Sequence, residues 1–251
     1  MISILPIANI AEVQPGDDLA AVLADAMRES GIEPAPFDIL VVTQKIVSKA
    51  EDRFVDLRTV TPGEEALALA AVTSKDPRLV QLVLAESASV VRAAPHVLIT
   101  RHHSGHVMAN AGIDRSNLGP GRDEMALLLP EDADASADRL RADLESRHGM
   151  KVAVLISDSF GRPWRHGVVG VAIGASGMPA LIDRRGELDR DGRELQVTQV
   201  ALGDLLATAA VLATGEGAEG IAAALIRGVT WQAPDVPAAG LVRPVEQDLF
   251  R

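Results

Sequence analysis

Short runs of aliphatic and β-branched residues alternate with helical patterns along most of the chain, and this alternation restricts the fold more than any other feature. The clearest run, residues 151–156, is strongly apolar and leads into polar residues. Such alternation is typical of mixed α/β proteins, so we expect a fold of the α/β (mixed α+β) class. The predicted strands cover residues 2–6, 39–43, 90–92, 97–100, 151–156, 168–173, 178–182 and 222–226. The predicted helices cover residues 17–28, 62–72, 76–87 and 198–213, a further helix is predicted to be capped by Asp134 or Ser136 and to end at 148–149, and a loop is predicted at 111–124.

The length of the chain allows one large domain or two small ones. Its 251 residues are enough to bury a substantial core in either arrangement. The sequence contains no repeat, low-complexity tract or flexible linker, and the best candidate boundary is the acidic stretch 130–138. We therefore expect a single unit over residues 1–251, with any division into two lobes near residues 130–138.

The composition excludes several kinds of site and location. Cysteine is absent, which removes disulfides, thiolate metal ligands and cysteine nucleophiles and suits a reducing cytoplasm. No apolar run reaches the roughly 18 residues that a membrane helix needs. The N-terminus has the pattern of a first strand rather than of a signal peptide. We therefore expect a cytoplasmic protein with no membrane partner.

The chain is acidic, with a formal net charge of −11. This charge weighs against a generally basic nucleic-acid binder, so we expect no nucleic-acid partner. An acidic chain that handles anions has to mask its own charge, and bound metal cations are one way to do so.

Residues 41–50 form the first segment with groups suited to chemistry. A buried strand leads directly into Lys45 and Lys49, together with small polar residues. Ammonium groups at a strand end are well placed to bind phosphate. Two ordinary surface lysines would give the same pattern, and for this segment alone that interpretation is favoured.

Residues 110–119 form the second segment. A loop bounded by glycines presents the carboxylate of Asp114, the hydroxyl of Ser116 and the amide of Asn117. Oxygen donors of this kind suit Mg²⁺ or Mn²⁺. A plain Asx-type turn has the same composition, because these residues favour turns for local backbone reasons.

Residues 154–165 give the strongest indication. An apolar strand ends in Asp158 and Ser159, which are followed by glycine and by Arg162 and Arg165. Ligands of open α/β sheets gather at the carboxyl ends of strands, and a carboxylate there commonly binds a metal in phosphoryl-transfer sites. The two arginines could hold a phosphate or carboxylate with paired hydrogen bonds. The alternative is a helix cap and turn with ordinary salt bridges.

Residues 213–220 form the fourth segment. Three glycines follow a predicted helix, with Glu216 and Glu219 between them. This loop could bring its backbone close to a nucleotide while Glu216 reaches a metal. A helix C-cap with a flexible turn would look the same.

Several familiar motifs are absent, and one histidine cluster needs its own interpretation. The sequence has no Walker A motif and no G-x-G-x-x-G between a strand and a helix, so we expect neither a P-loop nor a Rossmann fold. His102, His103 and His106 could suggest zinc, but adjacent residues of a strand face opposite ways. A polar substrate loop is the favoured interpretation of this cluster.

Taken together, these segments resemble the coenzyme F420-0:gamma-glutamyl ligase family, and the similarity runs nearly end to end. The matching motifs, in order, are Ile4-Leu5-Pro6, Pro15-Gly16-Asp17-Asp18-Leu19, Val41-Val42-Thr43, Val47-Ser48-Lys49, Gly112-Ile113-Asp114, Ser116-Asn117, Ser157-Asp158-Ser159-Phe160-Gly161-Arg162, Trp164-Arg165, Gly192-Arg193-Glu194-Leu195, Arg227-Gly228, Leu241-Val242-Arg243-Pro244 and Asp248-Leu249-Phe250.

The resemblance implies an activity and an architecture. It implies a GTP-dependent ligase that adds L-glutamate through γ-linkages to coenzyme F420-0 and F420-1, by way of an acyl phosphate, and releases GDP and phosphate. It also implies a two-part α/β fold that forms a homodimer, with the nucleotide groove near the subunit interface. The expected cofactors are GTP as co-substrate and two Mg²⁺ or Mn²⁺ ions, with K⁺ as a further candidate.

The resemblance also assigns residues by position. Asp114 and Asp158 would bind the first divalent metal, and Ser159 and Glu216 the second. Beside the metals, Arg162 and Arg165 are expected to add fixed positive charge, so the expected catalytic residues are Asp114, Asp158, Arg162 and Arg165. The expected GTP contacts are Ile10, Ala11, Glu12, Val13, Gln44, Lys49, Asn117, Thr214, Gly215, Glu216, Gly217, Ala218, Glu219, Gly220 and Ile221.

The chain departs from the family pattern in places. Many relatives carry Ser where this chain has Gln44 and Thr where it has Ser159, and both replacements keep an oxygen donor. Residues 174–177 and the pair His102-His103 have no counterpart that the resemblance assigns. The same metal and GTP motifs would also serve a ligase with a different carboxylate acceptor or a non-catalytic GTP-binding regulator, so these alternatives stay open.

Overall fold

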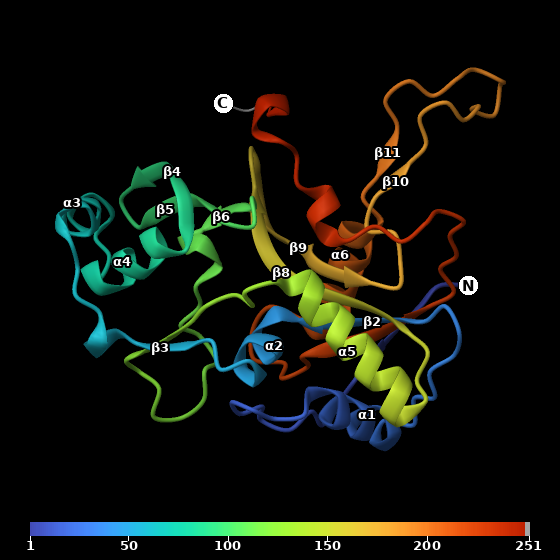
Figure 1. Ribbon diagram of the computed structural model, residues 1–251, viewed down its shortest axis with the longest axis horizontal. Helices are drawn as coiled ribbons and strands as arrows, with labels where there is room; N and C mark the ends of the chain where they lie inside the picture. Colours follow the sequence, from blue (N-terminus) through green and yellow to red (C-terminus); the bar gives the residue numbers. More distant parts are fainter. Residues whose placement is uncertain (249–251) are drawn as a thin grey trace.

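The computed structural model describes residues 1–248 and is built around one five-stranded sheet (Figure 1). The strands, in spatial order, are β1 (Ser3–Pro6), β12 (Ala223–Arg227), β2 (Ile39–Thr43), β8 (Ala153–Arg162) and β9 (Arg165–Ser176). β2 and β8 run parallel, whereas the other neighbouring strands run antiparallel. The carboxyl end of β2 therefore lies beside the middle of β8, with Thr43 opposite Ser157.

Helices cover both faces of this sheet. α1 (Leu19–Glu29) and α5 (Ala133–His148) pack on one face, where Leu40 of β2 joins their core. α6 (Leu202–Thr214) packs on the other face, where Ile39 joins a second core. Because side chains alternate between the faces of a strand, burial on both sides explains why β2 and the first half of β8 are continuous apolar runs in the sequence.

The chain forms a second lobe after α2 (Gln44–Ala50) and before α5, on the left of Figure 1. Its strands are β3 (Phe54–Asp56), β4 (Ser87–Ala94), β5 (Val97–His102), β6 (Val107–Ala109) and β7 (Met125–Leu127), its helices are α3 (Glu64–Thr73) and α4 (Pro77–Ala85), and its 3₁₀ turns are η1 (Leu57–Thr59) and η2 (Asn110–Gly112). This lobe has a core of its own, which includes Leu57, Val80, Val83, Leu98 and Ala126. The chain returns to the first lobe just before α5, inside the acidic stretch 130–138, and the expectation of a single folding unit stays a prediction.

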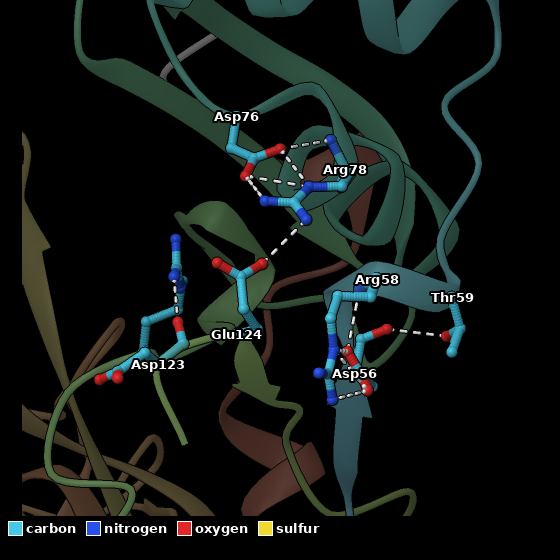
Figure 2. A network of polar contacts seen from close by, with 8 residues as sticks. Asp56, Arg58, Thr59, Asp76, Arg78, Asp123 and Glu124 are labelled. Carbon is cyan, nitrogen blue, oxygen red and sulfur yellow. Dashed lines mark hydrogen bonds and ion pairs between the residues drawn. The ribbon is translucent and has the colours of Figure 1, made fainter. Parts of the chain in front are cut away.

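A network of ion pairs fixes the far end of the 111–124 loop to this second lobe (Figure 2). Arg78, in the first turn of α4, holds the carboxylate of Asp76 through Nη2 at 2.6 Å and that of Glu124 through Nη1 at 2.9 Å. The N–H of Leu57 donates to the carbonyl of Glu124 at 2.8 Å. The loop is therefore tied down where it leaves the region of Asp114.

The remaining elements lie near the C-terminus. β10 (Ile182–Asp183) and β11 (Gln199–Val200) form a short antiparallel pair, from which residues 184–198 project as an arm (Figure 1). Two 3₁₀ turns follow β12: η3 (Ala238–Leu241) and η4 (Val245–Gln247). Leu249 and Phe250 of the last family motif lie outside the described residues. Within residues 1–248, no helix combines the length and the apolar character that crossing a bilayer requires.

Most of the predicted elements are confirmed, and with them the mixed α/β class. The strands predicted at 2–6, 39–43 and 222–226 correspond to β1, β2 and β12 within one residue at each end. The helices predicted at 17–28, 62–72 and 76–87 correspond to α1, α3 and α4 within two residues. The helix predicted before residues 148–149 corresponds to α5, but its N-cap is Asp132 and not Asp134 or Ser136. The shorter predictions at 90–92, 97–100 and 168–173 fall inside β4, β5 and β9.

The strand predicted at 178–182 was wrong. The run is apolar because Met178 and Ala180 are buried in the core beneath α6. Pro179 between them has no N–H for a strand ladder, and only an isolated bridge joins it to Val236. The helix predicted from residue 198 starts later, at Leu202, because residues 199–200 belong to β11.

Two features next to the site were missed. α2 follows β2 without any loop, and its seven residues are too few to show a helical period. β8 continues through Ser157 and Asp158 to Arg162, whereas the prediction ended the strand at residue 156. Ser157 still pairs with Thr43 of β2, and beyond it the extension pairs only with β9.

Candidate functional site

A cavity of about 930 Å³ opens at the carboxyl end of β2, beside the middle of β8. Segments far apart in the sequence line it: the N-terminal loop, the start of α2, the 111–124 loop, the middle of β8 and the glycine-rich loop after α6. Every residue that the family resemblance places beside nucleotide or metal lies on its wall. These residues are Ile10, Ala11, Glu12, Val13, Gln44, Lys49, Asp114, Asn117, Asp158, Ser159, Thr214, Gly215, Glu216, Gly217, Ala218, Glu219, Gly220 and Ile221.

β8 presents Asp158 and Ser159 to this cavity. A register shift in the β8–β9 pairing after Ile156 changes the course of the strand just before them. Protein atoms surround the carboxyl group of Asp158 although it stays partly accessible from the cavity. Burial raises the pKa of Asp158 to about 7, and the nearby charges of Asp114 and Glu216 act in the same direction. The N–H of Ser159, which donates to Asp158 Oδ1 at 2.8 Å, offsets only part of this rise.

The 111–124 loop presents Asp114. Its backbone N–H and carbonyl both bond with Leu127, which closes the base of the loop. Asp114 Oδ1 accepts from the N–H of Ser116 at 2.7 Å and from its hydroxyl at 2.8 Å, and Oδ2 lies 2.6 Å from Lys45 Nζ. Burial alone would raise the pKa of Asp114, but Lys45 and Ser116 outweigh burial and hold it below its ordinary value.

The glycine-rich loop presents Glu216. α6 ends at Thr214, and Gly215 turns the chain with a φ of +69°. Residues with a side chain rarely adopt this φ, so the turn favours glycine, and a Cβ would also displace the carboxyl group of Glu219. Ser159 Oγ donates to Glu216 Oε1 at 2.5 Å, and the N–H of Gly217 donates to Glu219 Oε2 at 2.8 Å. Glu216 and Ser159 therefore already lie together.

The start of α2 and the N-terminal loop form the opposite wall. The Lys49 side chain is only 5 % exposed, and its Nζ bonds to Glu12 Oε1 at 2.5 Å. Gln44 Oε1 accepts from the hydroxyl of Ser48 at 2.8 Å. Asn117, across the cavity, has a left-handed φ of 54°. This wall thus offers one buried ammonium group and the amide of Gln44, and Asn117 offers a second amide from across the cavity.

The two arginines expected to add catalytic charge do not line this cavity. Arg162 and Arg165 face each other across the β8–β9 hairpin, past the cavity. Arg165 is exposed, and Nη1 of Arg162 is buried without a hydrogen-bond partner among the described residues. The cation that takes their place at the carboxylates is Lys45.

Sequence reasoning named Lys45 as a possible phosphate ligand but did not include it among the expected site residues. Lys45 and Lys49 are one turn apart on α2, so both face the same side. Recognising α2 as a helix would therefore have placed both at the site. Other lining residues that were not selected are Thr43, Ile46, Arg115, Ser116, Leu118, Gly119, Arg122, Asp123, Ser157, Val168, Val211 and Ala222.

The histidine cluster lies outside the cavity, in the β5–β6 turn. Nδ1 of His102 and Nδ1 of His106 each lie 2.8 Å from Ser104 Oγ. His103 Nε2 lies 2.9 Å from the carbonyl of Ala85, and the His106 ring packs edge-on against Phe160. These local contacts give the cluster a role in joining the two lobes.

Residues 174–177, which the family pattern leaves unassigned, pack β9 against α5. A Cβ at Gly174 would lie 2.2 Å from the carbonyl oxygen of Ala133. The hydroxyl of Ser176 donates to Asp138 Oδ1 at 2.5 Å. The segment is therefore explained by close packing rather than by substrate binding.

The donors at the cavity fit a hard divalent cation. Asp114, Asp158, Ser159 and Glu216 supply only oxygen atoms, and the carboxylates repel one another, as the raised pKa of Asp158 indicates. Within residues 1–248, no three His, Asp or Glu side chains form a ready-made cage. Mg²⁺ is commonly bound by one or two carboxylates with substrate phosphates and water, so the residues fit a cation that arrives with a phosphate ligand.

Comparison with known proteins defines the class of this chain. The sequence model of the family described as F420-0:Gamma-glutamyl ligase matches residues 8–228, so the chain belongs to this family. This result confirms the resemblance inferred from the sequence motifs.

Individual relatives are similar over nearly their whole length. The coenzyme F420:L-glutamate ligase of Methanopyrus kandleri is 45% identical over 252 residues, which cover 98% of this chain and 96% of the relative. The proteins of the same name from Methanothermobacter thermautotrophicus and Natronomonas pharaonis are 41% and 44% identical. These alignments cover 100% and 98% of this chain and 99% and 94% of the relatives.

Proposed function

We propose that this protein is a GTP- and divalent-metal-dependent ligase that joins L-glutamate by γ-linkage to coenzyme F420-0 and F420-1, releasing GDP and phosphate. The similarity to coenzyme F420:L-glutamate ligases over nearly the whole chain supports the acceptor and the amino acid. One structural observation carries the rest: Asp114, Asp158, Ser159 and Glu216, from three distant segments, line a single cavity with Lys49.

The reaction has to activate a carboxylate, because a carboxylate does not react with an amine directly. An acceptor carboxylate oxygen attacks the γ-phosphorus of GTP, the bond to the β-phosphate oxygen breaks, and GDP leaves. The glutamate amine then attacks the acyl phosphate carbon, the carbon–oxygen bond to phosphate breaks, and the amine loses a proton. Phosphoryl transfer of this kind depends mainly on positioning and on charge neutralisation.

The residues of the cavity suit these two requirements. Asp114 and Asp158 would hold one divalent cation and Ser159 and Glu216 the other, and the cations would offset the negative charge on the transferring phosphate. Lys49, fixed by Glu12 and largely buried, supplies positive charge that does not depend on a bound ion. The backbone of residues 214–220, which glycine allows to approach closely, lines the cavity next to Glu216.

Assembly, location and a further cation belong to the same proposal. We expect a homodimer with the nucleotide cavity near its interface, a cytoplasmic location, and K⁺ as a further candidate ion.

The test is a mass measurement of the product. Purified protein is incubated with GTP, Mg²⁺, L-glutamate and F420-0, and the deazaflavin product is weighed by mass spectrometry while GDP and phosphate are quantified. The proposal expects one glutamyl increment or more and one GDP for each. Phosphate release with another carboxylic acid but not with F420-0 would show that the acceptor is that acid and not F420-0. GTP binding without phosphate release would show that the protein is a non-catalytic GTP-binding regulator and not a ligase.

A further inference from the structure

Lys45 occupies the place at Asp114 that a cation would take. Its Nζ lies 2.6 Å from Asp114 Oδ2, 3.0 Å from the carbonyl oxygen of Ser116 and 3.2 Å from the Ser116 hydroxyl. The other carboxylate oxygen, Oδ1, accepts from the N–H and the hydroxyl of Ser116. Both oxygens of Asp114 are therefore already bonded to groups of the chain itself.

This arrangement opposes a divalent cation. A cation at Asp114 would lie within a few ångströms of the Lys45 ammonium group, and like charges at that distance repel by several kcal/mol unless water screens them. Water does not fully screen these charges, because the side chain of Lys45 is only 22% exposed and that of Asp114 only 28% exposed. The cation can bind well only after the ammonium group has moved away.

We infer that Lys45 is a built-in counter-ion of Asp114 that keeps the divalent cation from binding until a phosphate ligand arrives with it. This inference rests on the proposed function, because it takes Asp114 as a metal ligand. It adds an order of events: nucleotide and cation enter together, and neither completes the site alone.

The Lys45 ammonium group can move away from Asp114 and still find bonding partners nearby. Lysine has a flexible four-carbon stem, so Nζ can leave Oδ2 without any change in α2. It can keep its bond to the carbonyl of Ser116, and a phosphate brought in with the cation supplies the anion that it loses at Asp114. Lys49 differs, because it is almost completely buried and paired with Glu12 on the other wall.

The experiment measures Mn²⁺ binding without nucleotide, by electron paramagnetic resonance of the free ion. Lys45→Met removes the charge and keeps the stem. We expect it to bind Mn²⁺ at least about tenfold more tightly than the wild-type protein. Lys45→Arg should bind Mn²⁺ as the wild type does. Lys151→Met is the matched control, because Lys151 is 75% exposed and lies on the surface beside Glu145, and it should leave the affinity unchanged.

Two further measurements keep the result interpretable. The double variant Lys45→Met with Asp114→Asn should lose the gain in Mn²⁺ affinity. This loss would assign the gain to the carboxylate of Asp114. Lys45→Gln gives the same comparison if Lys45→Met does not fold. A non-hydrolysable GTP analogue should tighten Mn²⁺ binding by a smaller factor in Lys45→Met than in the wild type. The reason is that Lys45→Met already lacks the repulsion between ammonium group and cation that the nucleotide relieves.

The outcomes separate the inference from the proposed function. If Lys45→Met binds Mn²⁺ no more tightly than the wild type, while Asp114→Asn still removes Mn²⁺ binding in the presence of the analogue, the counter-ion role is overturned and the metal site stands. If Asp114→Asn leaves Mn²⁺ binding unchanged with the analogue, the metal assignment itself is wrong.

Discussion

Replacing Asp158 by Asn should make the cation-free protein more stable and inactive at the same time. Burial raises the pKa of this carboxyl group to about 7, from its ordinary value of 3.8, and the charges of Asp114 and Glu216 contribute. The folded chain therefore holds a proton here that the unfolded chain gives up. For an acid with a raised pKa, stability is present at low pH and is lost as pH rises from the unfolded to the folded value.

The magnitude follows from the two pKa values. Above pH 7 the folded protein bears an ionised carboxylate in an unfavourable place, at a cost of at most about 4 kcal/mol. At pH 5 the folded group is still protonated, and the cost is about 2 kcal/mol, because only the unfolded chain has ionised. Asn resembles the protonated acid, so Asp158→Asn should raise the free energy of unfolding by these amounts.

The assay is urea unfolding of wild type and Asp158→Asn at pH 5 and pH 8, without divalent cations, together with the ligation assay. Asp191→Asn, on the exposed arm, is a matched control for loss of a carboxylate and should show no such gain. A gain for Asp158→Asn that is equal at both pH values, or no gain at pH 8, would refute the reasoning. Ligation by Asp158→Asn at the wild-type rate would refute the role in metal binding.

Three further changes test other parts of the site and the fold. Asp114→Ala should lower the rate of ligation by more than about 10²–10³-fold with an unchanged melting temperature, and retained Mg²⁺-dependent ligation would contradict the assignment. Lys49→Met should weaken GTP binding in calorimetric titration, and an unchanged affinity would exclude Lys49 from nucleotide binding. Gly170→Ala should lower the free energy of unfolding by about 1–3 kcal/mol, because the new Cβ would lie 2.3 Å from the backbone carbonyl oxygen of Ala207. Gly161→Ala, with open space at the same atom, is its control, and equal stability of the two variants would count against this packing argument.

The sequence could predict those parts of the fold whose cause is local. β2 is apolar along its length because both of its faces are buried, and α5 begins where Asp132 accepts the N–H of Ala135 and ends at Gly149, which is left-handed. The position of Asp158 directly after the apolar half of β8 could likewise be predicted, because an apolar run followed by a carboxylate is a local pattern.

The sequence could not predict features that depend on distant contacts. α2 is too short to show a period and is held by packing between β2 and the second lobe. Arg162 carries the charge expected of a phosphate ligand, yet the long β8–β9 hairpin takes it past the cavity. Lys45 meets Asp114 only because the chain returns after 69 residues and closes the loop on Leu127, which no pattern around Lys45 indicates.

The position of the site follows from the order of the strands. In the sheets of residues 1–248, β2 and β8 are the one pair of neighbouring strands that run parallel. β2 therefore ends beside the point where β8 leaves it and continues paired with β9 alone, and each chain segment delivers polar residues to the same place: α2 with Lys45 and Lys49 from one, Asp158 and Ser159 from the other. At an antiparallel pair, one strand would arrive as the other leaves, and these charges would lie at opposite ends of the sheet. The parallel pairing of β2 with β8 thus explains why lysines and carboxylates about 110 residues apart share one cavity. Ligand sites are expected where parallel strands lead out of a sheet in this way.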